Sequence, residues 1–189
     1  MAMGETQTEH GVSTWTLDPA HTLVGFSAKH MMFTTVRGKF NEVKGTVTVD
    51  ADHPDRSSVE VEVPAASLDT GVEQRDNHLR SADFLEVEKH PAITFRSRRV
   101  EGAAQREGER FKVVGDLSIR GTTREVVLDA VYEGEGKDPW GGTRAGFSAT
   151  TKIDRRDFGL TWNQVLETGG ILVGNEIRIE IEVQAVKQG

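Results

Sequence analysis

The chain of 189 residues contains no cysteine. Disulfide bonds, thiolate metal sites and cysteine nucleophiles are therefore excluded. The chain also lacks any run of 18 apolar residues, so we expect no stable membrane insertion. Residues 1–13 are polar and do not contain the apolar stretch of a secretory signal, which favours a cytoplasmic location.

Long basic segments are missing as well. Lysine and arginine total 23 and aspartate and glutamate total 30, which gives a net charge of −7 at pH 7. This balance argues against nucleic acid or an anionic membrane as a partner. The sequence also contains no G-x-S-x-G nucleophile motif, no phosphate-binding P-loop and no glycine-rich dinucleotide motif, so it carries no catalytic signature.

What the sequence does contain is a period-2 alternation of apolar and polar residues. Residues 59–63 alternate valine with glutamate, and residues 177–183 alternate isoleucine or valine with charged residues. Successive side chains of a strand point to opposite faces, so each such segment has one apolar face. Many strands of this kind with little helix between them indicate a sheet that closes on itself or packs on another.

The pattern predicts an all-β fold with about eight main strands and one helical insertion. Strands are expected at residues 15–17, 21–30, 40–50, 58–63, 92–100, 111–120, 125–132, 144–153 and 176–185. Residues 31–36 are ambiguous and fit one helical turn. A capping box formed by Thr70 and Glu73 predicts a helix over residues 71–80, between the fourth and fifth main strands, with a second, shorter helix at 81–85. An antiparallel barrel of this size holds one small ligand.

Several sequence blocks resemble the YceI-like family. They are WTLDPAHT at 15–22, FSAKHMM at 26–32, VRGKF at 36–40, SLDTG at 67–71, RDNHL at 75–79, SADFL at 81–85, PAITF at 91–95, GDLSIRGTT at 115–123 and IDRRDFGL at 153–160. The blocks occur in the family's order over residues 15–186. The resemblance implies a bacterial, lipocalin-like barrel, here at residues 14–189. The polar residues 1–13 before it are expected to form a flexible tail. The resemblance further implies binding of a long apolar chain: a polyisoprenoid, an isoprenoid quinone or a fatty-acid-like lipid.

The inward side chains of such a barrel either line a cavity or fill a core. Small inward residues favour a cavity, because alanine and glycine leave space: Ala28, Gly115, Ala130, Ala145 and Ala149 share the inward phase. His30 is the best candidate for a polar contact with a ligand head. Met31 and Met32 suit an adaptable portal, since methionine fills irregular space. The candidate ligand-binding residues are Phe26, His30, Met31, Met32, Phe40, Phe84, Phe95, Leu117, Phe147, Phe158, Leu160 and Trp162.

Two other functions stay open. One is a barrel hydrolase or isomerase that acts on an apolar substrate, with His30, His78 or Asp76 as acid or base. The other is a metal- or haem-binding stress protein, although no H-x-H or H-x-x-x-H pair is present. We expect a binding protein with no catalytic residue, no metal and no cofactor. The charged segments at 75–76 and 154–157 are expected to pin loops to the barrel rim, and residues 58–63 or the C-terminal strand to support a homodimer.

Overall fold

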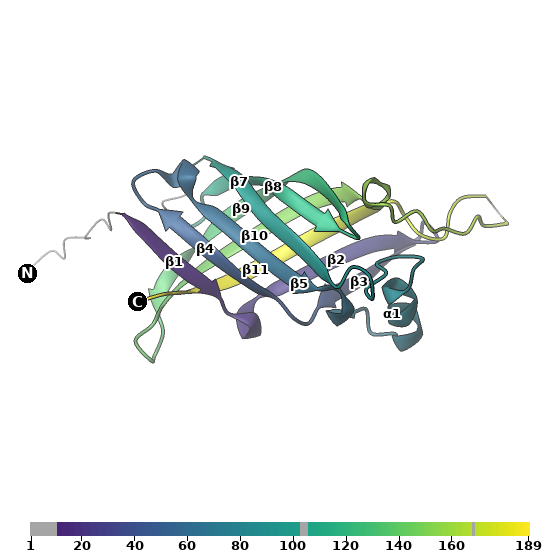
Figure 1. Cartoon of the computed structure of the whole chain (residues 1–189), viewed down its shortest axis with the longest axis horizontal. Coiled ribbons are helices and arrows are strands. Elements are labelled where there is room, and N and C mark those ends of the chain that lie inside the picture. Colours follow the sequence, from purple (N-terminus) through teal and green to yellow (C-terminus); the bar gives the residue numbers. More distant parts are fainter. Residues whose placement is uncertain (1–10, 103–105, 168) are drawn as a thin grey trace, which may run out of the picture.

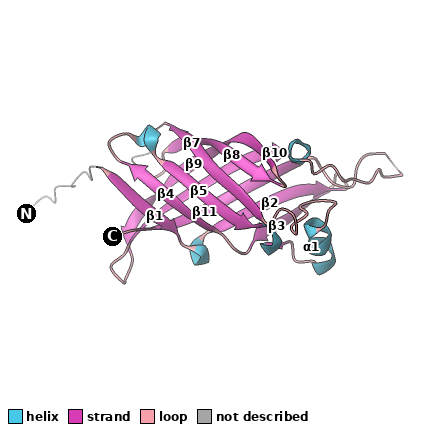
Figure 2. Ribbon diagram, in the orientation of Figure 1, coloured by secondary structure: helices cyan, strands magenta, loops and turns pink. Residues whose placement is uncertain are grey.

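The structure is a computed structural model that describes residues 11–102, 106–167 and 169–189. In this part of the chain it contains eleven strands, one α-helix and four short 3-10 helices (Figures 1 and 2). The strands and the helix are β1 (Val12–Leu17), β2 (Leu23–His30), β3 (Thr34–Phe40), β4 (Lys44–Asp50), β5 (Ser58–Pro64), β6 (Leu68–Asp69), α1 (Glu73–Arg80), β7 (Ala92–Glu101), β8 (Arg110–Ile119), β9 (Thr122–Lys137), β10 (Thr143–Asp154) and β11 (Glu176–Lys187).

Eight of the strands form a closed antiparallel barrel. Their order is β1-β4-β5-β7-β8-β9-β10-β11, and β11 pairs back to β1 from Trp15 opposite Lys187 to Leu17 opposite Ala185. The predicted all-β antiparallel barrel of about eight strands is therefore confirmed. Closure satisfies the backbone groups that an open sheet leaves at its edges. The edges of β5 and β11, which we expected to be available to a second copy, are both occupied by neighbouring strands.

The other three strands continue β1, β4 and β5 after short interruptions of the sheet. These interruptions, which we call breaks, lie at residues 18–22, 41–43 and 65–67. β2 pairs with the first half of β11, β3 pairs with β2, and β6 pairs with β3. Asp18 N, between β1 and β2, donates to Gln184 O of β11 at 2.8 Å, and Asn41 N, between β3 and β4, donates to Ser67 O, between β5 and β6, at 2.9 Å. Pro19 lies in the first break, between β1 and β2, and a proline cannot donate to a strand ladder. The resulting extension lies at the end of the barrel that carries α1 (Figure 1).

We name the two ends by their elements. The α1 end contains α1, the β2–β3 turn and the start of β11, and the β1 end contains the start of β1 and the end of β11 (Figure 1). Two buried clusters correspond to this division. One lies towards the α1 end and includes Phe84, Leu117 and Phe158. The other is centred on Trp15 and Ala185.

The structure corrects several boundaries. Residues 34–40 form β3 rather than part of a helical turn, so the strand expected at 40–50 begins only at Lys44. β1 begins at Val12, inside the expected tail of residues 1–13, and residues 1–10 lie outside the described residues. The placement of the helix between the fourth and fifth main strands is not confirmed: α1 follows β6, because the sequence pattern missed β3 and the two-residue β6.

The predicted capping box is wrong. The residue before α1 is Val72, which makes no side-chain capping hydrogen bond. Both the amide and the hydroxyl of Thr70 instead donate to Oδ1 of Asp76, which is buried. Residues 81–85 form successive turns and not a second helix. The start of α1 is therefore joined to Thr70 by a buried carboxylate and not by a capping box.

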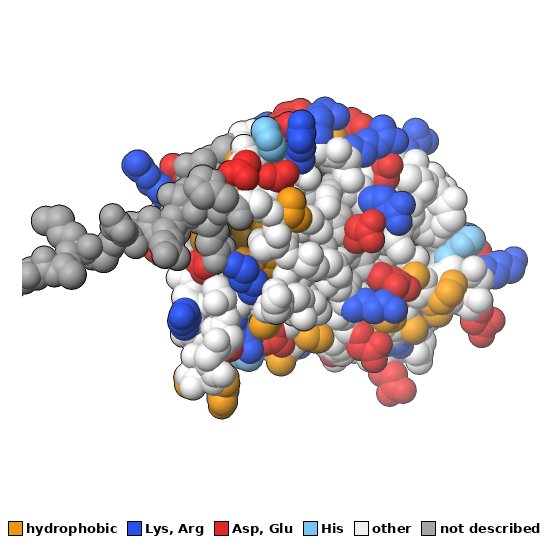
Figure 3. Space-filling model, turned by 60° about the vertical axis from the view of Figure 1, so that its left-hand side comes forward, with side chains coloured by type: hydrophobic (Ala, Val, Ile, Leu, Met, Phe, Trp, Pro, Cys, Tyr) orange, Lys and Arg blue, Asp and Glu red, His pale blue; other side chains and the backbone are white. Residues whose placement is uncertain are grey.

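The outer surface of the barrel is charged with both signs. On the face that Figure 3 shows, Lys, Arg, Asp and Glu side chains are intermixed, with only small hydrophobic areas between them. Cross-strand pairs such as Arg96–Glu60 at 3.2 Å and Arg98–Asp116 at 2.9 Å account for part of this pattern. Exposed pairs of this kind each contribute less than about 1 kcal/mol, so the apolar interior carries the stability of the fold.

Candidate functional site

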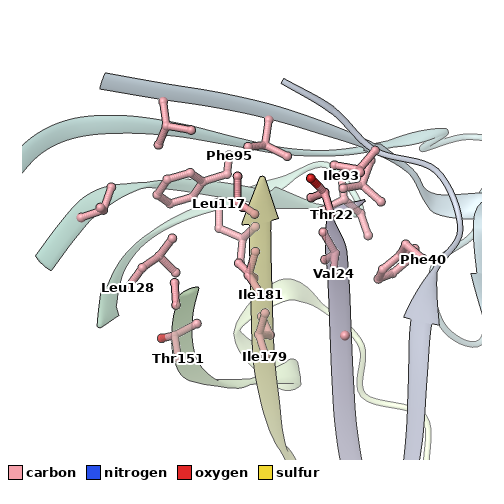
Figure 4. A pocket seen from close by; sticks show the side chains of 18 of the residues that line it. Thr22, Val24, Phe40, Ile93, Phe95, Leu117, Leu128, Thr151, Ile179 and Ile181 are labelled. Atoms are coloured by element: carbon pink, nitrogen blue, oxygen red, sulfur yellow. The ribbon is translucent and has the colours of Figure 1, made fainter. Parts of the chain in front are cut away.

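The interior of the barrel is a continuous apolar cavity of about 1590 Å³. Its lining extends from Val12, Asp50 and Gly189 at the β1 end to Arg75 and Trp162 at the α1 end. Side chains from opposite walls point into the same space, as the close view in Figure 4 shows for Val24, Phe95, Leu117 and Ile181. Pockets for drug-sized ligands measure roughly 300–1,000 Å³, so this cavity accommodates a larger guest.

The lining follows directly from the period-2 pattern. On β11, Ile177, Ile179, Ile181 and Val183 line the cavity while the charged residues between them are exposed. The register places Ile179 opposite Phe26 and Ile181 opposite Val24 on β2. Each strand thus contributes one apolar row, and the closed sheet joins these rows into a continuous hydrocarbon wall.

Glycine and alanine keep the interior hollow. A Cβ on Gly38 would lie 2.3 Å from Phe26 Cζ, and a Cβ on Gly115 would lie 2.5 Å from Phe95 Cζ. The two rings therefore occupy space along the wall that any other residue at these positions would fill. Near the middle of the wall Ala149 pairs directly with Ala130. Protein interiors are normally close-packed, so a void of this size depends on such local choices.

Ten of the twelve predicted residues line the cavity. They are Phe26, His30, Phe40, Phe84, Phe95, Leu117, Phe147, Phe158, Leu160 and Trp162. The structure does not bring Met31 and Met32 into the lining. They form the turn between β2 and β3, with exposed fractions of 38% and 59%, because the chain reverses immediately after His30. Contact of the ten residues with a ligand stays a prediction.

An aromatic group lies at the α1 end of the cavity. The ring centroids of Trp162 and His78 are 4.6 Å apart, and Phe84 lies 5.1 Å from His78 and 5.3 Å from Trp162. His78 is fixed by a hydrogen bond of 2.9 Å between Nε2 and Asp83 Oδ2. The long segment after β10 and the turns after α1 thus meet at this end of the cavity, which we call its mouth. Sequence reasoning selected Phe84 and Trp162 individually but had no signal for their contact.

Arg155 holds the long segment that carries Trp162. Its side chain is buried, and its guanidinium donates to the carbonyl oxygens of Leu160 at 2.7 Å, Trp162 at 2.8 Å and Gly174 at 3.0 Å. Burial lowers the pKa of the Arg155 guanidinium. Among the described residues no carboxylate forms an ion pair with it, whereas Arg156 pairs with Asp154 at 2.6 Å. We expected both arginines to pin loops through carboxylates, and Arg155 does so through backbone carbonyls.

The basic, acidic and histidine residues of the lining are divided between the two ends. At the α1 end they are Lys29, His30, Arg75, His78 and Arg155. At the β1 end the lining includes Asp50 and Glu135 together with Lys187. In the described part of the chain, every carboxylate of the lining is therefore remote from the α1 end. Sequence reasoning named only His30 as a polar contact, since nothing in the pattern brings Lys29 and Arg75 to one opening.

The residues proposed for acid–base chemistry do not form a hydrogen-bonded group. His30 and His78 line the cavity, but Asp76 is buried against Thr70. No hydrogen bond joins these three side chains within the described ranges. The same ranges contain no group of three histidine, aspartate or glutamate side chains that is arranged to hold a metal ion.

Comparison with known proteins identifies the family. The YceI-like domain profile matches residues 15–185. The chain belongs to the YceI-like family. It is 44% identical over 140 residues to a UPF0312 protein of Azotobacter vinelandii, an alignment that covers 74% of this chain and 71% of that protein. The resemblance seen in the sequence blocks is thereby confirmed.

Solved structures agree with this assignment. The YCEI protein of Campylobacter jejuni has a TM-score of 0.70 at 30% identity, with 85% of this chain and 90% of that chain covered. A domain from Saccharophagus degradans, described as polyisoprenoid-binding, has a TM-score of 0.65 at 13% identity and covers 95% of this chain and 100% of that domain. At that identity the second likeness shows the shared barrel alone. None of the helices in the described part of this YceI-like chain has the length and apolar character needed to cross a bilayer.

Proposed function

We propose that this YceI-like protein binds one long-chain amphiphile, a polyisoprenoid, isoprenoid quinone or fatty-acid-like lipid, and sequesters or transports it inside the barrel. The observation that carries the proposal is the hydrocarbon-lined cavity of about 1590 Å³ that extends from one barrel end to the other. A long, narrow, apolar guest fits such a space. The polyisoprenoid-binding description of the S. degradans domain supports the same ligand class.

The energetics favour a chain over a compact ligand. Burial of a methylene contributes roughly 0.8 kcal/mol, so a five-carbon isoprene unit contributes on the order of 3–4 kcal/mol. Two or three buried units therefore give useful affinity before any polar contact is made. Selectivity should then depend on the length and width of the chain, with weak discrimination between head groups.

The direct test is organic extraction of the purified protein followed by mass spectrometry. We expect one prenyl or acyl lipid per barrel. If the protein is purified empty, it should take up an isoprenoid quinone or a fatty amide that is added from a small volume of ethanol. A protein that neither carries nor takes up any such lipid would rule out the proposal.

A matched pair of variants locates the bound chain. Ala149 lines the cavity, and its neighbour Thr150 on β10 is exposed. Ala149→Phe should lower lipid affinity by at least about tenfold, the effect of leaving roughly two methylenes outside the cavity. Thr150→Phe adds the same ring on the outer face and should leave affinity unchanged. Equal effects from the two variants would place the lipid outside the barrel.

Two further expectations remain predictions. The cytoplasmic location rests on sequence reasoning alone. A homodimer would have to use a surface other than the edges of β5 and β11, because both edges are paired within the barrel.

A further inference from the structure

Two neighbouring segments project from the α1 end. One is the turn between β2 and β3, and the other consists of residues 163–167 and 169–172, which extend beyond the barrel in Figure 1. Backbone hydrogen bonds join them: Met31 N donates to Leu172 O at 2.8 Å, and Gly174 N donates to Lys29 O at 2.9 Å. Within the second segment Val165 forms a bridge with Ile171. The two projections therefore present a common surface.

This surface is apolar and exposed. Phe33 is 80% exposed, Val165 78%, Met32 59% and Met31 38%. We call these four residues the apolar rim. Nine large apolar side chains are exposed in the described part of the chain, and the rim contains four of them. Val72, 47% exposed at the start of α1, adds a fifth at the same end, so the exposed apolar surface is concentrated there.

The turn that carries the two methionines is unfavourable for them. Phe33 N donates to His30 O at 3.1 Å, and the two residues between have positive φ, 51° at Met31 and 66° at Met32. A β-turn with positive φ at both central positions is of type I′, which favours glycine, asparagine and aspartate. Methionine has a steric cost in this conformation. The burial gained is only partial, since Met31 is 38% and Met32 is 59% exposed, with Met32 Sδ lying against Gly170.

The apolar rim adjoins the mouth of the cavity. Lys29 and His30, which precede the turn, line the cavity, and so do Leu172 and Val173 on the second projection. Of the described residues that line this end, Lys29, Arg75 and Arg155 are basic and His30 and His78 are histidines. The carboxylate of Asp83 lies beside them, 2.9 Å from Nε2 of His78. An opening with exposed hydrocarbon and cationic groups around it matches the interface of a lipid bilayer, where acyl chains lie beneath phosphate groups.

We propose that the apolar rim docks on the surface of a lipid bilayer, with the α1 end facing the membrane. The inference rests on the proposed function, because a long-chain amphiphile resides in membranes and crosses water only at a large cost. Docking places the mouth against the hydrocarbon, so the chain passes between bilayer and cavity without exposure to water. Methionine side chains suit this contact because they are flexible and adapt to irregular apolar surroundings. A second copy on the same surface would cover the mouth and obstruct this exchange.

Co-sedimentation with vesicles tests the docking. The full-length protein is mixed with vesicles of phosphatidylcholine, alone or with phosphatidylglycerol, that contain no added cargo. We expect the unmodified protein to sediment with the vesicles and the double variant Met31→Asn with Met32→Gly to bind at least tenfold more weakly. Because Asn-Gly fits the turn, this variant should keep or raise the midpoint of thermal unfolding. Trp140→Ser is the control: Trp140 is 85% exposed at the β1 end, and its loss should leave vesicle binding unchanged.

Other results would overturn the proposal. They are failure of the unmodified protein to bind either vesicle, equal binding by the double variant, or a dimer in light scattering that the double variant dissociates. The last result would assign the apolar rim to a second copy of the chain.

Uptake of an isoprenoid quinone separates docking from cargo binding. From ethanol, the double variant should bind the quinone with unchanged affinity, whereas from vesicles it should acquire the quinone at least tenfold more slowly. If the double variant and the unmodified protein acquired the quinone from vesicles at equal rates, the proposed docking surface would be contradicted and the proposed cargo binding would not. Vesicle binding by a protein that takes up no lipid from ethanol would support the docking surface and contradict the proposed function.

Discussion

The ring of Phe26 lies where a side chain of Gly38 would otherwise be. The two residues are directly opposite on β2 and β3, and a Cβ on residue 38 would lie 2.3 Å from Phe26 Cζ. The missing side chain allows the aromatic ring to occupy the wall and not the centre of the barrel. The same relationship recurs between Phe95 and Gly115. The width of the cavity therefore depends on a few glycine positions.

Replacement of Gly38 should narrow the cavity. In Gly38→Val the new side chain displaces the Phe26 ring towards the lumen, and overpacking of this kind costs about 1–3 kcal/mol of folding stability. We expect lipid affinity to fall by about tenfold, since roughly two methylenes lose their place. Titration with an isoprenoid quinone and thermal unfolding measure the two effects. Gly136→Val is the control, because a Cβ there meets no atom within 4 Å. Unchanged quinone affinity in Gly38→Val would contradict this account of the cavity.

Removal of the Arg155 guanidinium should destabilise the segment that carries Trp162. Arg155→Met leaves buried carbonyl oxygens without donors, for which we expect a loss of about 3 kcal/mol in the free energy of unfolding. Arg155→Lys should recover little, because one ammonium group does not reproduce the planar fork of donors. Urea denaturation measures the loss, and hydrogen exchange over residues 160–174 shows where it occurs. Arg156→Met should cost less than about 1 kcal/mol, since that side chain is exposed. A similar cost in both variants would count against the role given to Arg155.

Acid should weaken the contacts that Asp18 makes between β1 and β2. A hydrogen bond from His21, followed by one from Arg144, lowers the pKa of Asp18 from 3.8 to about 2. Because the folded-state pKa is the lower one, the stabilisation is present above about pH 4 and is lost as the pH falls towards 2. It amounts to at most about 2 kcal/mol.

Urea unfolding between pH 6 and pH 2 checks this dependence on Asp18. Asp18→Asn should be less stable than the unmodified protein at pH 6 and should lose less stability on acidification. Arg144→Gln should also make the free energy of unfolding depend less on pH, because it removes a partner of the Asp18 carboxylate. Part of the acid sensitivity should remain, since hydrogen bonds from Arg144 and Arg156 also lower the pKa values of Asp138 and Asp154. If the free energy of unfolding of Asp18→Asn depended on pH as strongly as that of the unmodified protein, this carboxylate would be excluded as a source of acid sensitivity.

Trp162 should report on a ligand at the α1 end. Its ring lines the cavity between His78 and Phe84, so a bound quinone lies close enough to quench its fluorescence. We expect Trp162→Phe to remove a large share of the quenching that accompanies quinone binding. Trp140→Phe should leave the quenching unchanged, because Trp140 is exposed at the other end of the barrel. If Trp140→Phe removed the quenching and Trp162→Phe did not, the quinone would lie outside the cavity.

The sequence predicted the barrel well because its long strands repeat a strict alternation. The isoleucines of β11 share one phase over residues 177–181, and every one of them lines the cavity. Ten of the twelve candidate residues lie in the lining for the same reason, since inward phase and apolar character select positions on the inner wall. The resemblance to the YceI-like family rested on nine sequence blocks in a fixed order along the chain.

The errors occur where local pattern is weak. β3 alternates poorly, with threonine, arginine, glycine and lysine among its residues, so its pairing with β2 decides its conformation. The two-residue β6 has no period at all. Met31 and Met32 looked like strand-end portal residues, and only the tight reversal after His30 turned them away from the cavity.

By itself the sequence determined an all-β barrel with an apolar interior, because side-chain alternation is a local property of each strand. Only the tertiary structure decided that the interior is hollow and that basic groups and exposed methionines meet at one mouth. Those features depend on which residues of separate strands become neighbours: Phe26 with Gly38, Met31 with Leu172, and Arg155 with the carbonyl oxygens of a distant loop. Such neighbours are fixed by register and closure of the sheet, and no single segment of the chain specifies either.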